Sequence, residues 1–337
     1  MRSPAEAPDA DDRLAWVGRA LGDRYHVTRL IGHGGVGAVY EAHDGTGAPF
    51  AVKILDREWA REEVVVARFA REARAASAVE SRRIVRVLDG GTEDGCPYLV
   101  MELLPGEDLG ARLERLRRLP LDEALQIVEE VLEGLVAAHA AGIVHRDLKP
   151  DNVLLSDRAD ATSAVTIVDF GMSKIDRRQG GTVPLPLTGK GVVLGTPLYM
   201  SPEQARASTD VDGRSDVYSA GAILFECLAG RPPHTGETHE QVLLHICLED
   251  APDVRRWAPE VPDTLAALVA RALARERDDR FATADEMLAA VRAIGRVGAG
   301  DVRRARRRAR ARVAVAAVIA MLAGAVVTLL AVALAGR

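Results

Sequence analysis

The feature that most constrains the fold of this chain is an eight-residue run, His145-Arg146-Asp147-Leu148-Lys149-Pro150-Asp151-Asn152, followed later by Asp169-Phe170-Gly171. The run supplies a carboxylate, an ammonium and an amide at fixed offsets, and the triplet adds a second carboxylate. Transfer of a phosphoryl group from a nucleotide needs these groups: a base for the hydroxyl proton, a cation near the phosphoryl group and oxygen ligands for Mg²⁺. We therefore expect a fold that brings both segments together in one cleft.

These residues resemble the signature motifs of the protein-kinase superfamily, specifically of bacterial, membrane-anchored, eukaryotic-like Ser/Thr kinases. The resemblance covers about residues 25–294 and implies an α+β, bilobal fold. The N-lobe (25–104) would hold an antiparallel sheet and one helix, and the C-lobe (105–294) would be mainly helical. The resemblance also implies ATP and Mg²⁺, or Mn²⁺ in its place, as cofactors, and protein Ser and Thr hydroxyls as acceptors.

Composition is compatible with a packed core, since 48% of the 337 residues are hydrophobic and 28% are charged. The net charge is −5, yet residues 303–312 (RRARRRARAR) hold seven Arg and no acid, so the remainder is more acidic still. An acidic body argues against nucleic-acid binding by the folded part. Cys96, Cys227 and Cys247 are widely separated and form neither a metal-ligand spacing nor a disulfide framework, which fits a reducing compartment.

The N-terminal segment, residues 1–24, begins acidic and rich in Pro and Ala. It has no apolar stretch of the kind that marks a cleavable signal peptide. We expect most of it to be disordered, with a short helix around residues 14–21.

The C-terminal segment predicts a transmembrane helix over residues 313–335, after a basic juxtamembrane segment, 295–312. An uncharged run of this length spans about 36 Å as a helix, enough for a hydrocarbon core of about 30 Å. A buried core helix is the alternative. The Arg band predicts a single pass through the bacterial inner membrane, with the folded part cytoplasmic and the C-terminus outside. Little sequence follows the helix, so the chain is either tail-anchored or a truncated version of a longer protein.

Two further interpretations attach to this segment. Arg303–Arg312 would bind anionic membrane lipids, and a nucleic-acid or targeting role for the same band is the alternative. Ala316, Ala320 and Gly324 share a helix face that would let two copies approach closely as a homodimer. The abundance of Ala in this chain explains the same pattern without a dimer.

A glycine-rich turn, Gly32-His33-Gly34-Gly35-Val36-Gly37, lies between two β-type runs. A dinucleotide-binding fold would place a helix directly after the glycines, whereas a β-type run follows here, as a hairpin over phosphates requires. The resemblance implies that ATP is bound by Ile31, Gly32, His33, Gly34, Gly35, Val36, Gly37, Ala38, Val39, Ala51, Lys53, Met101, Glu102, Leu104 and Leu154.

Lys53 lies in the predicted strand Phe50–Leu55 and would contact the α- and β-phosphates. Its expected partner is Glu72 on a helix predicted over residues 58–79, because Phe69, Ala73 and Ala76 put Glu72 on the inward face. Glu62 and Glu63 are the rejected candidates, and a solvated surface Glu is the alternative reading of Glu72.

The resemblance assigns the chemistry to four further residues. Asp147 would orient the attacking hydroxyl and accept its proton, and Lys149 would stabilise charge on the γ-phosphoryl group. Asn152 and Asp169 would hold the magnesium ions. Lys149, two residues after Asp147, is the Ser/Thr-kinase form of this loop. Thr196, expected to contact Asp147 and Lys149 and to lie in the substrate-docking stretch, agrees with that form.

The activation segment is expected to span Asp169–Glu203. Its phosphorylation candidates are Thr188 and then Thr182, with Arg146 as the group that would bind the phosphate. An unmodified, flexible loop is the alternative. Two structural roles follow from the resemblance: Asp216 would hold the backbone of the catalytic loop, and Glu203 would pair with Arg280 inside the C-lobe.

Two rival functions remain to be weighed. A catalytically silent pseudokinase scaffold would be expected to lack one of Lys53, Asp147, Asn152 or Asp169, and all four are present. A small-molecule phosphotransferase shares a base and a metal carboxylate but rarely carries a docking segment ending in Ser-Pro-Glu, as at residues 201–203.

Overall fold

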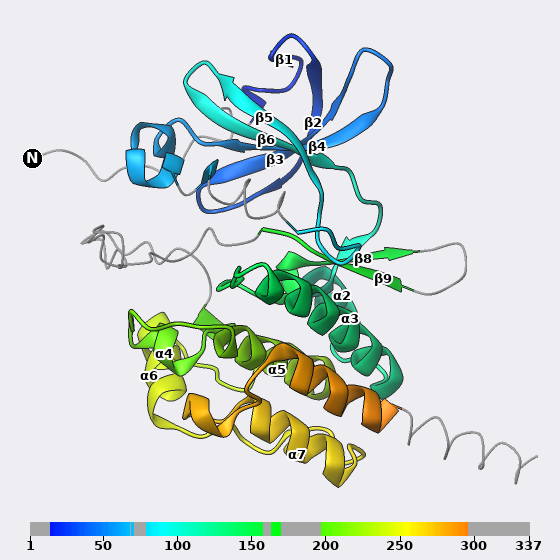
Figure 1. Cartoon of the computed structure of the whole chain (residues 1–337), viewed down its shortest axis with the longest axis vertical. Helices are drawn as coiled ribbons and strands as arrows, with labels where there is room; N and C mark the ends of the chain where they lie inside the picture. Colours follow the sequence, from blue (N-terminus) through cyan, green and yellow to red (C-terminus); the bar gives the residue numbers. More distant parts are fainter. Residues whose placement is uncertain (1–13, 68, 71–78, 158–162, 170–196, 296–337) are drawn as a thin grey trace, which may run out of the picture. The chain divides into compact units, whose positions relative to one another are not determined.

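The computed structural model describes residues 14–67, 69–70, 79–157, 163–169 and 197–295. The N-lobe is built on a six-stranded antiparallel sheet (Figure 1), whose spatial order is β1-β2-β3-β4-β6-β5. Its strands are β1 (Ala20–Leu21), β2 (Tyr25–His33), β3 (Gly37–His43), β4 (Pro49–Leu55), β5 (Val87–Glu93) and β6 (Cys96–Glu102). The predicted strands are confirmed to within a few residues.

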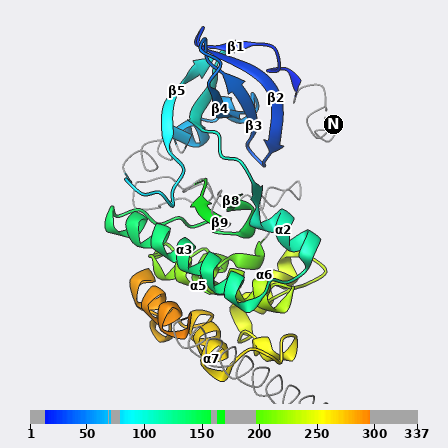
Figure 2. The same cartoon turned by 90° about the vertical axis from the view of Figure 1, so that its right-hand side faces the viewer.

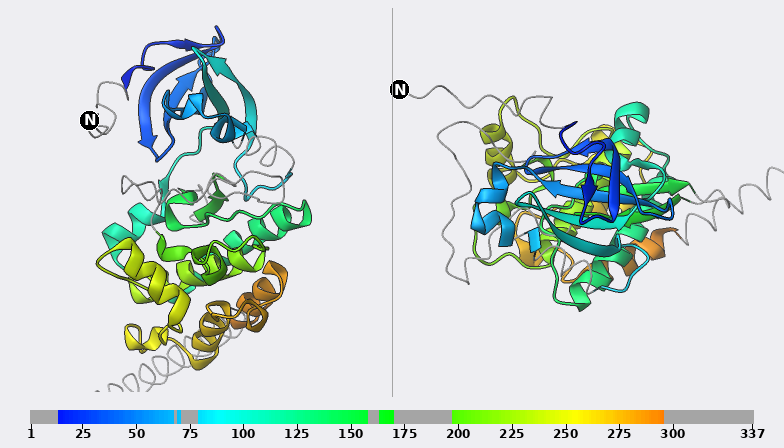
Figure 3. Two further views of the ribbon diagram at one scale, coloured as in Figure 1. Left: turned by 90° about the vertical axis from the view of Figure 1, so that its left-hand side faces the viewer. Right: turned by 90° about the horizontal axis from the view of Figure 1, so that it is seen from above.

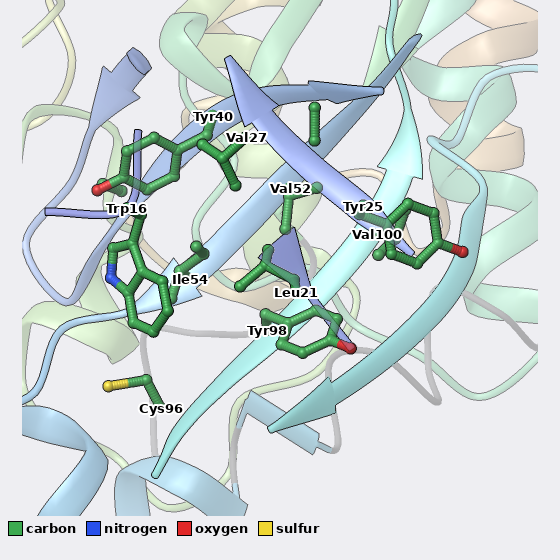
Figure 4. Close-up of a cluster of buried hydrophobic side chains, with 12 residues drawn as sticks. Trp16, Leu21, Tyr25, Val27, Tyr40, Val52, Ile54, Cys96, Tyr98 and Val100 are labelled. Carbon is green, nitrogen blue, oxygen red and sulfur yellow. The ribbon is translucent and has the colours of Figure 1, made fainter. Parts of the chain in front are cut away.

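Alternation along β4 divides the N-lobe into two apolar layers. Val52 and Ile54 pack on one face with a cluster that includes Tyr25, Tyr40 and Val100 (Figure 4). Successive side chains of a strand point to opposite faces. Lys53 therefore shares the other face with Ala51 and Leu55, which belong to two separate apolar clusters. A buried Lys, 6% exposed, between these clusters is not a solvated strand residue.

The N-lobe begins before residue 25, contrary to the predicted disordered segment. Trp16 is 5% exposed and Leu21 is fully buried, and both belong to the cluster of Figure 4. Residues 14–18 form turns, and β1 pairs with β2 in place of the expected helix over residues 14–21. The burial of two large apolar side chains explains why these residues are ordered. Residues 1–13 lie outside the described part.

The helix predicted over residues 58–79 also starts later than expected. A 3₁₀ turn, η2 (Trp59–Arg61), comes first, and Glu62 has an extended backbone with φ −92° and ψ 101°. Residues 63–67 are then helical, as are 69 and 70. Trp59 and Phe69 pack on the same apolar cluster, so the apolar periodicity continued across the break. Glu72 lies outside the described residues.

The C-lobe is mainly helical and carries a small antiparallel sheet of three strands, β7 (Glu107–Asp108), β8 (Val153–Asp157) and β9 (Ser163–Ile167). Its helices are α2 (Leu109–Leu116), α3 (Leu121–Ala140), α4 (Pro202–Ala205), α5 (Arg214–Ala229), α6 (His239–Leu248) and α7 (Asp263–Ala272), with 3₁₀ turns η3 (Pro150–Asn152), η5 (Pro197–Tyr199), η6 (Val254–Arg256) and η7 (Arg277–Asp279).

The buried helix α5 forms the centre of this lobe. It contacts α3 on one side and α7 on the other (Figure 3), and α3 also contacts β9 (Figure 2). Nearly every side chain of α5 is buried, whereas α3 buries one stripe that includes Leu125, Val128 and Leu132. This stripe is the amphipathic face predicted from the 3.6-residue period.

The closing helix predicted over residues 263–292 is two helices. The first, α7, ends at Ala272, and residues 284–295 form the second. Arg280 lies between them with an extended backbone, and its side chain is buried. Among the described residues no helix is both long and apolar enough to cross a membrane. The segment predicted to do so, 313–335, is not among them.

Candidate active site

The catalytic-loop run is held by a buried carboxylate on α5. Asp216 is fully buried and accepts hydrogen bonds from the backbone N–H groups of His145 and Arg146, both at 2.8 Å. Arg146 has a φ of 66°, a left-handed conformation that costs a non-glycine residue energy and so needs such support. His139 at the end of α3 reaches the same carboxylate, with Nε2 2.8 Å from Oδ2. The sequence had suggested no role for His139.

His145 links the run to the residue that precedes Asp169. Its Nδ1 accepts the backbone N–H of Asp147 at 3.2 Å, so the ring proton lies on Nε2. That nitrogen donates to the carbonyl of Val168 at 3.1 Å. In return, Val168 donates its N–H to the carbonyl of Asn152 at 3.0 Å. The two segments that the sequence singled out are therefore tied together through the backbone and one imidazole.

Three predicted reacting groups lie close along this loop. Asp147 and Lys149 are half-buried, so both remain accessible to a ligand. Asn152 is 5% exposed, and its Nδ2 donates to the carbonyl of Asp147 at 2.8 Å. Because the amide nitrogen is used in this way, the amide oxygen of Asn152 is the atom of this side chain that could bind a metal.

An ion pair joins the two lobes at Lys53. Its Nζ lies 2.7 Å from Oδ1 of Asp169, which is half-buried and has a φ of 59°. Burial alone would raise the pKa of Asp169, but the charge and hydrogen bond of Lys53, helped by the charge of Lys149, hold that pKa below its usual value. Asp169 is therefore an anion at neutral pH, beside a catalytic loop.

The donor set fits a magnesium ion that shares its shell with phosphates. Asp169 offers a carboxylate and Asn152 an amide oxygen, the hard ligands that Mg²⁺ prefers. In the described part of the chain, no group of three or more His, Cys, Asp or Glu side chains could hold a metal by itself. Mg²⁺ is commonly bound through one or two protein ligands, and substrate phosphates and water complete its octahedron.

The glycine-rich turn is the hairpin between β2 and β3, as predicted. Its glycines differ in their surroundings. A Cβ on Gly32 would meet nothing within 4 Å, and one on Gly34 would make only an ordinary contact of 3.6 Å. A Cβ on Gly37, by contrast, would lie 2.3 Å from the carbonyl oxygen of Ile54. The close packing of β3 on β4 therefore requires a glycine at position 37. This reason is separate from the predicted role of the hairpin over phosphates.

Four of the apolar residues expected around a nucleotide base form one cluster. Ala51 and Met101 are buried in it, with Val39 and Leu104 at its edge. Val168, Val85, Val87 and Leu103 also belong to it. Leu154 is half-buried on β8, opposite Thr166, and is not part of that cluster. Glu102 donates its N–H to the carbonyl of Arg86 at 3.2 Å, so this N–H is not available to a base.

Inside the C-lobe, Glu203 and Arg280 form a two-pronged ion pair. The guanidinium donates to both carboxylate oxygens, at 2.8 and 2.9 Å, and its side chain has no exposure. Burial would raise the pKa of Glu203, but Arg280 keeps it below its usual value. Gln204, next to Glu203, donates from Nε2 to the carbonyl of Arg146 at 2.8 Å and so connects this pair to the catalytic loop.

Glu226, another carboxylate of the C-lobe, has a raised pKa, whereas the pKa of Glu203 is lowered. Tyr199 donates its hydroxyl to Glu226 on α5 at 2.6 Å. Burial raises the pKa of Glu226, the hydrogen bond from Tyr199 opposes the rise, and Asp151 adds to it. The sequence had suggested no role for either Tyr199 or Glu226.

Four predicted site residues cannot be placed. Glu72, Thr182, Thr188 and Thr196 lie outside the described residues.

Comparisons with known proteins agree with this geometry. The family model "Protein kinase domain" matches residues 25–315. Serine/threonine-protein kinase pkn3 of Myxococcus xanthus is 37% identical over 294 residues, which cover 85% of this chain and 52% of that protein. Serine/threonine-protein kinase PknL of Mycobacterium tuberculosis is 38% identical over 275 residues, which cover 81% of this chain and 66% of PknL. The chain thus spans between half and two thirds of these relatives.

A solved structure gives the same answer for the fold. The crystal structure of the Mycobacterium tuberculosis PknI kinase domain superimposes with a TM-score of 0.63 at 26% identity, and the match covers 82% of this chain and 97% of that domain. The predicted bilobal fold, with a sheet N-lobe and a helical C-lobe, is confirmed. The chain belongs to the protein kinase domain family.

Proposed function

We propose that this protein is an ATP- and Mg²⁺-dependent protein serine/threonine kinase. The observation that carries the proposal is the contact of 2.7 Å between Lys53 and Asp169, beside a loop that Asp216 holds by two backbone hydrogen bonds. The similarity to serine/threonine-protein kinases at 37–38% identity supports Ser and Thr as acceptors, as does Lys149 two residues after Asp147.

In the proposed reaction, a substrate hydroxyl oxygen forms a bond to the γ-phosphorus of ATP while the bond from that phosphorus to the β–γ bridging oxygen breaks. Asp147 takes the hydroxyl proton, and ADP leaves. Lys149 stabilises the charge on the transferred group, and Lys53, for which Glu72 is the expected partner, would orient the α- and β-phosphates. Mg²⁺, or Mn²⁺, held by Asn152 and Asp169, would neutralise charge on the phosphates.

The remaining roles are assigned by the same resemblance. Residues 31–39 would cover the phosphates, and Ala51, Met101, Glu102, Leu104 and Leu154 would surround the base. Thr196 would help dock the acceptor. Autophosphorylation of Thr188, or of Thr182, would order the activation segment by creating a charge-assisted pair with Arg146.

The kinase domain would be anchored at the bacterial inner membrane by residues 313–335. Support comes from an uncharged run long enough to span the hydrocarbon core and from the adjoining Arg303–Arg312, which would also bind anionic lipids. Ala316, Ala320 and Gly324 would share one face of this helix, and such small residues would let two copies approach closely as a homodimer. A reporter fused after Arg337 tests the topology: a periplasmic signal is expected, and a cytoplasmic signal contradicts it.

The activity is tested with the purified 337-residue chain in detergent. With γ-labelled ATP and Mg²⁺, label should appear on Ser or Thr of the chain itself or of a generic basic protein. Asp147→Asn should reduce transfer by about 10²- to 10⁴-fold, the usual contribution of a general base. Nucleotide affinity should be unchanged in this variant.

Absence of transfer by the unaltered chain with both Mg²⁺ and Mn²⁺, despite nucleotide binding, would favour the pseudokinase scaffold. Equal transfer by the two chains would remove Asp147 from its proposed role. Mass-spectrometric mapping of phosphosites, compared between them, would identify which activation-segment Thr is modified.

A further inference from the structure

A buried carboxylate on α3, which the proposed reaction does not use, contacts two other parts of the chain as well as a residue of its own helix. Glu130 is 9% exposed. Its Oε2 accepts hydrogen bonds from the guanidinium of Arg83 and, at 2.9 Å, from the backbone N–H of Val165 on β9. Its Oε1 accepts from Nε2 of Gln126 at 3.2 Å. An acid in the apolar stripe of a helix, with donors on both oxygens, is bound in place by charge-assisted hydrogen bonds.

Arg83 is itself fixed to β9 by the backbone. Its carbonyl accepts the N–H of Ile167 at 2.7 Å, and Val85 donates its N–H to the carbonyl of Ile167 at 3.0 Å. Ile84 and Ile167 form a parallel bridge. Helix α3 also packs closely on β9, because a Cβ on Gly134 of α3 would lie 2.7 Å from Cδ1 of Ile167. Residues 83–85, β9 and α3 therefore meet at one junction.

This junction lies next to the metal-binding end of the site. Two residues after Ile167 comes Asp169, and between them Val168 is bonded to Asn152 and His145. A shift of β9 relative to α3 would therefore move Asp169. The burial of Val165, which has no exposure, leaves its N–H dependent on the Glu130 acceptor. Loss of that acceptor strands a buried donor.

We propose that Glu130 is a positioning residue for Mg²⁺-nucleotide binding: by holding Arg83 and Val165 against α3, it sets the position of Asp169. The proposal rests on the proposed function, since Asp169 is a Mg²⁺ ligand only within it. Glu133 offers a matched control on the same helix. It accepts from Nε of Arg83 at 2.9 Å and is more exposed, with 32% of its side chain accessible, whereas the carboxylate that accepts the N–H of Val165 on β9 is Glu130.

The test uses the 337-residue chain with Glu130→Gln, an isosteric change that removes the charge. Affinity for a non-hydrolysable ATP analogue is measured by calorimetry with Mg²⁺ and with a chelator. The gain in affinity that Mg²⁺ produces should fall by roughly 10- to 100-fold, the range typical for groups that orient a metal ligand. Affinity in the chelator should stay unchanged, and Glu133→Gln should keep the full Mg²⁺-dependent gain.

An unchanged Mg²⁺-dependent gain in Glu130→Gln would overturn the proposal, because a merely structural carboxylate would lower the melting temperature alone. If Glu130→Gln fails to fold, Arg83→Lys replaces it, since that variant keeps a cation but loses the planar fork. A smaller Mg²⁺-dependent gain in Arg83→Lys supports the proposal, and a full gain contradicts it. Labelled-phosphate transfer by the unaltered chain is measured in parallel, so that failure of the proposed kinase activity is seen separately from failure of the positioning role.

Discussion

The ammonium of Lys53, on β4 of the N-lobe, lies 2.7 Å from the carboxylate of Asp169, which follows β9 of the C-lobe. The ion pair joins two residues that are 116 positions apart in sequence. It also keeps Asp169 ionised despite its burial, so that the carboxylate is ready to accept a cation.

Replacement of Lys53 by Met should reduce phosphate transfer by about 10²- to 10³-fold, the effect of removing one fixed electrostatic group from an active site. The pKa of Asp169 should rise, because burial then acts without the opposing ammonium. Labelled transfer and the pH dependence of unfolding measure the two effects. With Lys53 present, the lowered pKa of Asp169 stabilises the fold above the usual carboxyl range, and this contribution is lost as the pH falls through the folded value. If phosphate transfer is unchanged in Lys53→Met, Lys53 has no role in the transfer reaction.

The Glu203–Arg280 pair should be important for stability rather than for chemistry. Arg280→Met should lower the free energy of unfolding by about 3–5 kcal/mol, because Glu203 would remain as an unpaired buried charge. Arg118→Met is the control: its pair with Glu260 is at 3.0 Å but both side chains are more than half exposed, at 52% and 60%. It should cost at most about 1 kcal/mol. Urea denaturation compares the variants, and equal losses would contradict the structural role.

Gly37 should be the least replaceable glycine of the β2–β3 hairpin. In Gly37→Ala the new Cβ would meet the carbonyl oxygen of Ile54 at 2.3 Å, a backbone atom that cannot turn aside. Such overpacking should cost about 1–3 kcal/mol of unfolding free energy. Gly32→Ala, with open space around the position, should stay within about 0.5 kcal/mol of the unaltered chain. If the two variants unfold alike, β3 and β4 are not packed as described.

Local patterns predicted most of the fold. The apolar run Phe50–Leu55 reflects a strand buried on both faces, the apolar stripe of α3 reflects burial of one helix face, and both elements are confirmed. Breaks within a continuing apolar pattern were missed, because Trp59 and Phe69 pack on one cluster from either side of a turn. The break at Arg280 was missed for the same reason. There the chain leaves the helical path, and the side chain of Arg280 reaches Glu203.

Within the candidate site, the catalytic-loop residues were found because they form one run in the sequence, and Asp216 and the Glu203–Arg280 pair were found through the resemblance. The missed contacts join residues far apart: His139 and Asp216 are separated by 77 positions, and Arg83 and Glu130 by 47. Hydrophobic periodicity is a local pattern, so it contains no information about pairs so far apart. One signal was available for Glu130, since an acid that interrupts the apolar stripe of an amphipathic helix needs a buried partner.

Glu226 gives the sharpest pH prediction, because its pKa is raised whereas that of Glu203 is lowered. A carboxyl with a raised folded pKa binds protons more tightly in the folded than in the unfolded state. Its contribution to stability is therefore complete below the usual Glu pKa of 4.5 and is lost as the pH rises through the folded value. Glu226→Gln keeps the acceptor for Tyr199 but cannot ionise. The variant should therefore gain stability relative to the unaltered chain as the pH rises from about 4 to 8.

Glu203→Gln should show the opposite pH dependence. Arg280 lowers the pKa of Glu203, so this carboxylate stabilises the fold above the usual Glu range, and its contribution is lost as the pH falls through the folded value. The penalty of Glu203→Gln should therefore be greatest at neutral pH and should shrink in acid. Melting temperatures of the three chains between pH 4 and 8 compare the two slopes. Slopes of the same sign would mean that Glu226 is ionised and paired in the folded protein, contrary to its burial beside Tyr199 and Asp151.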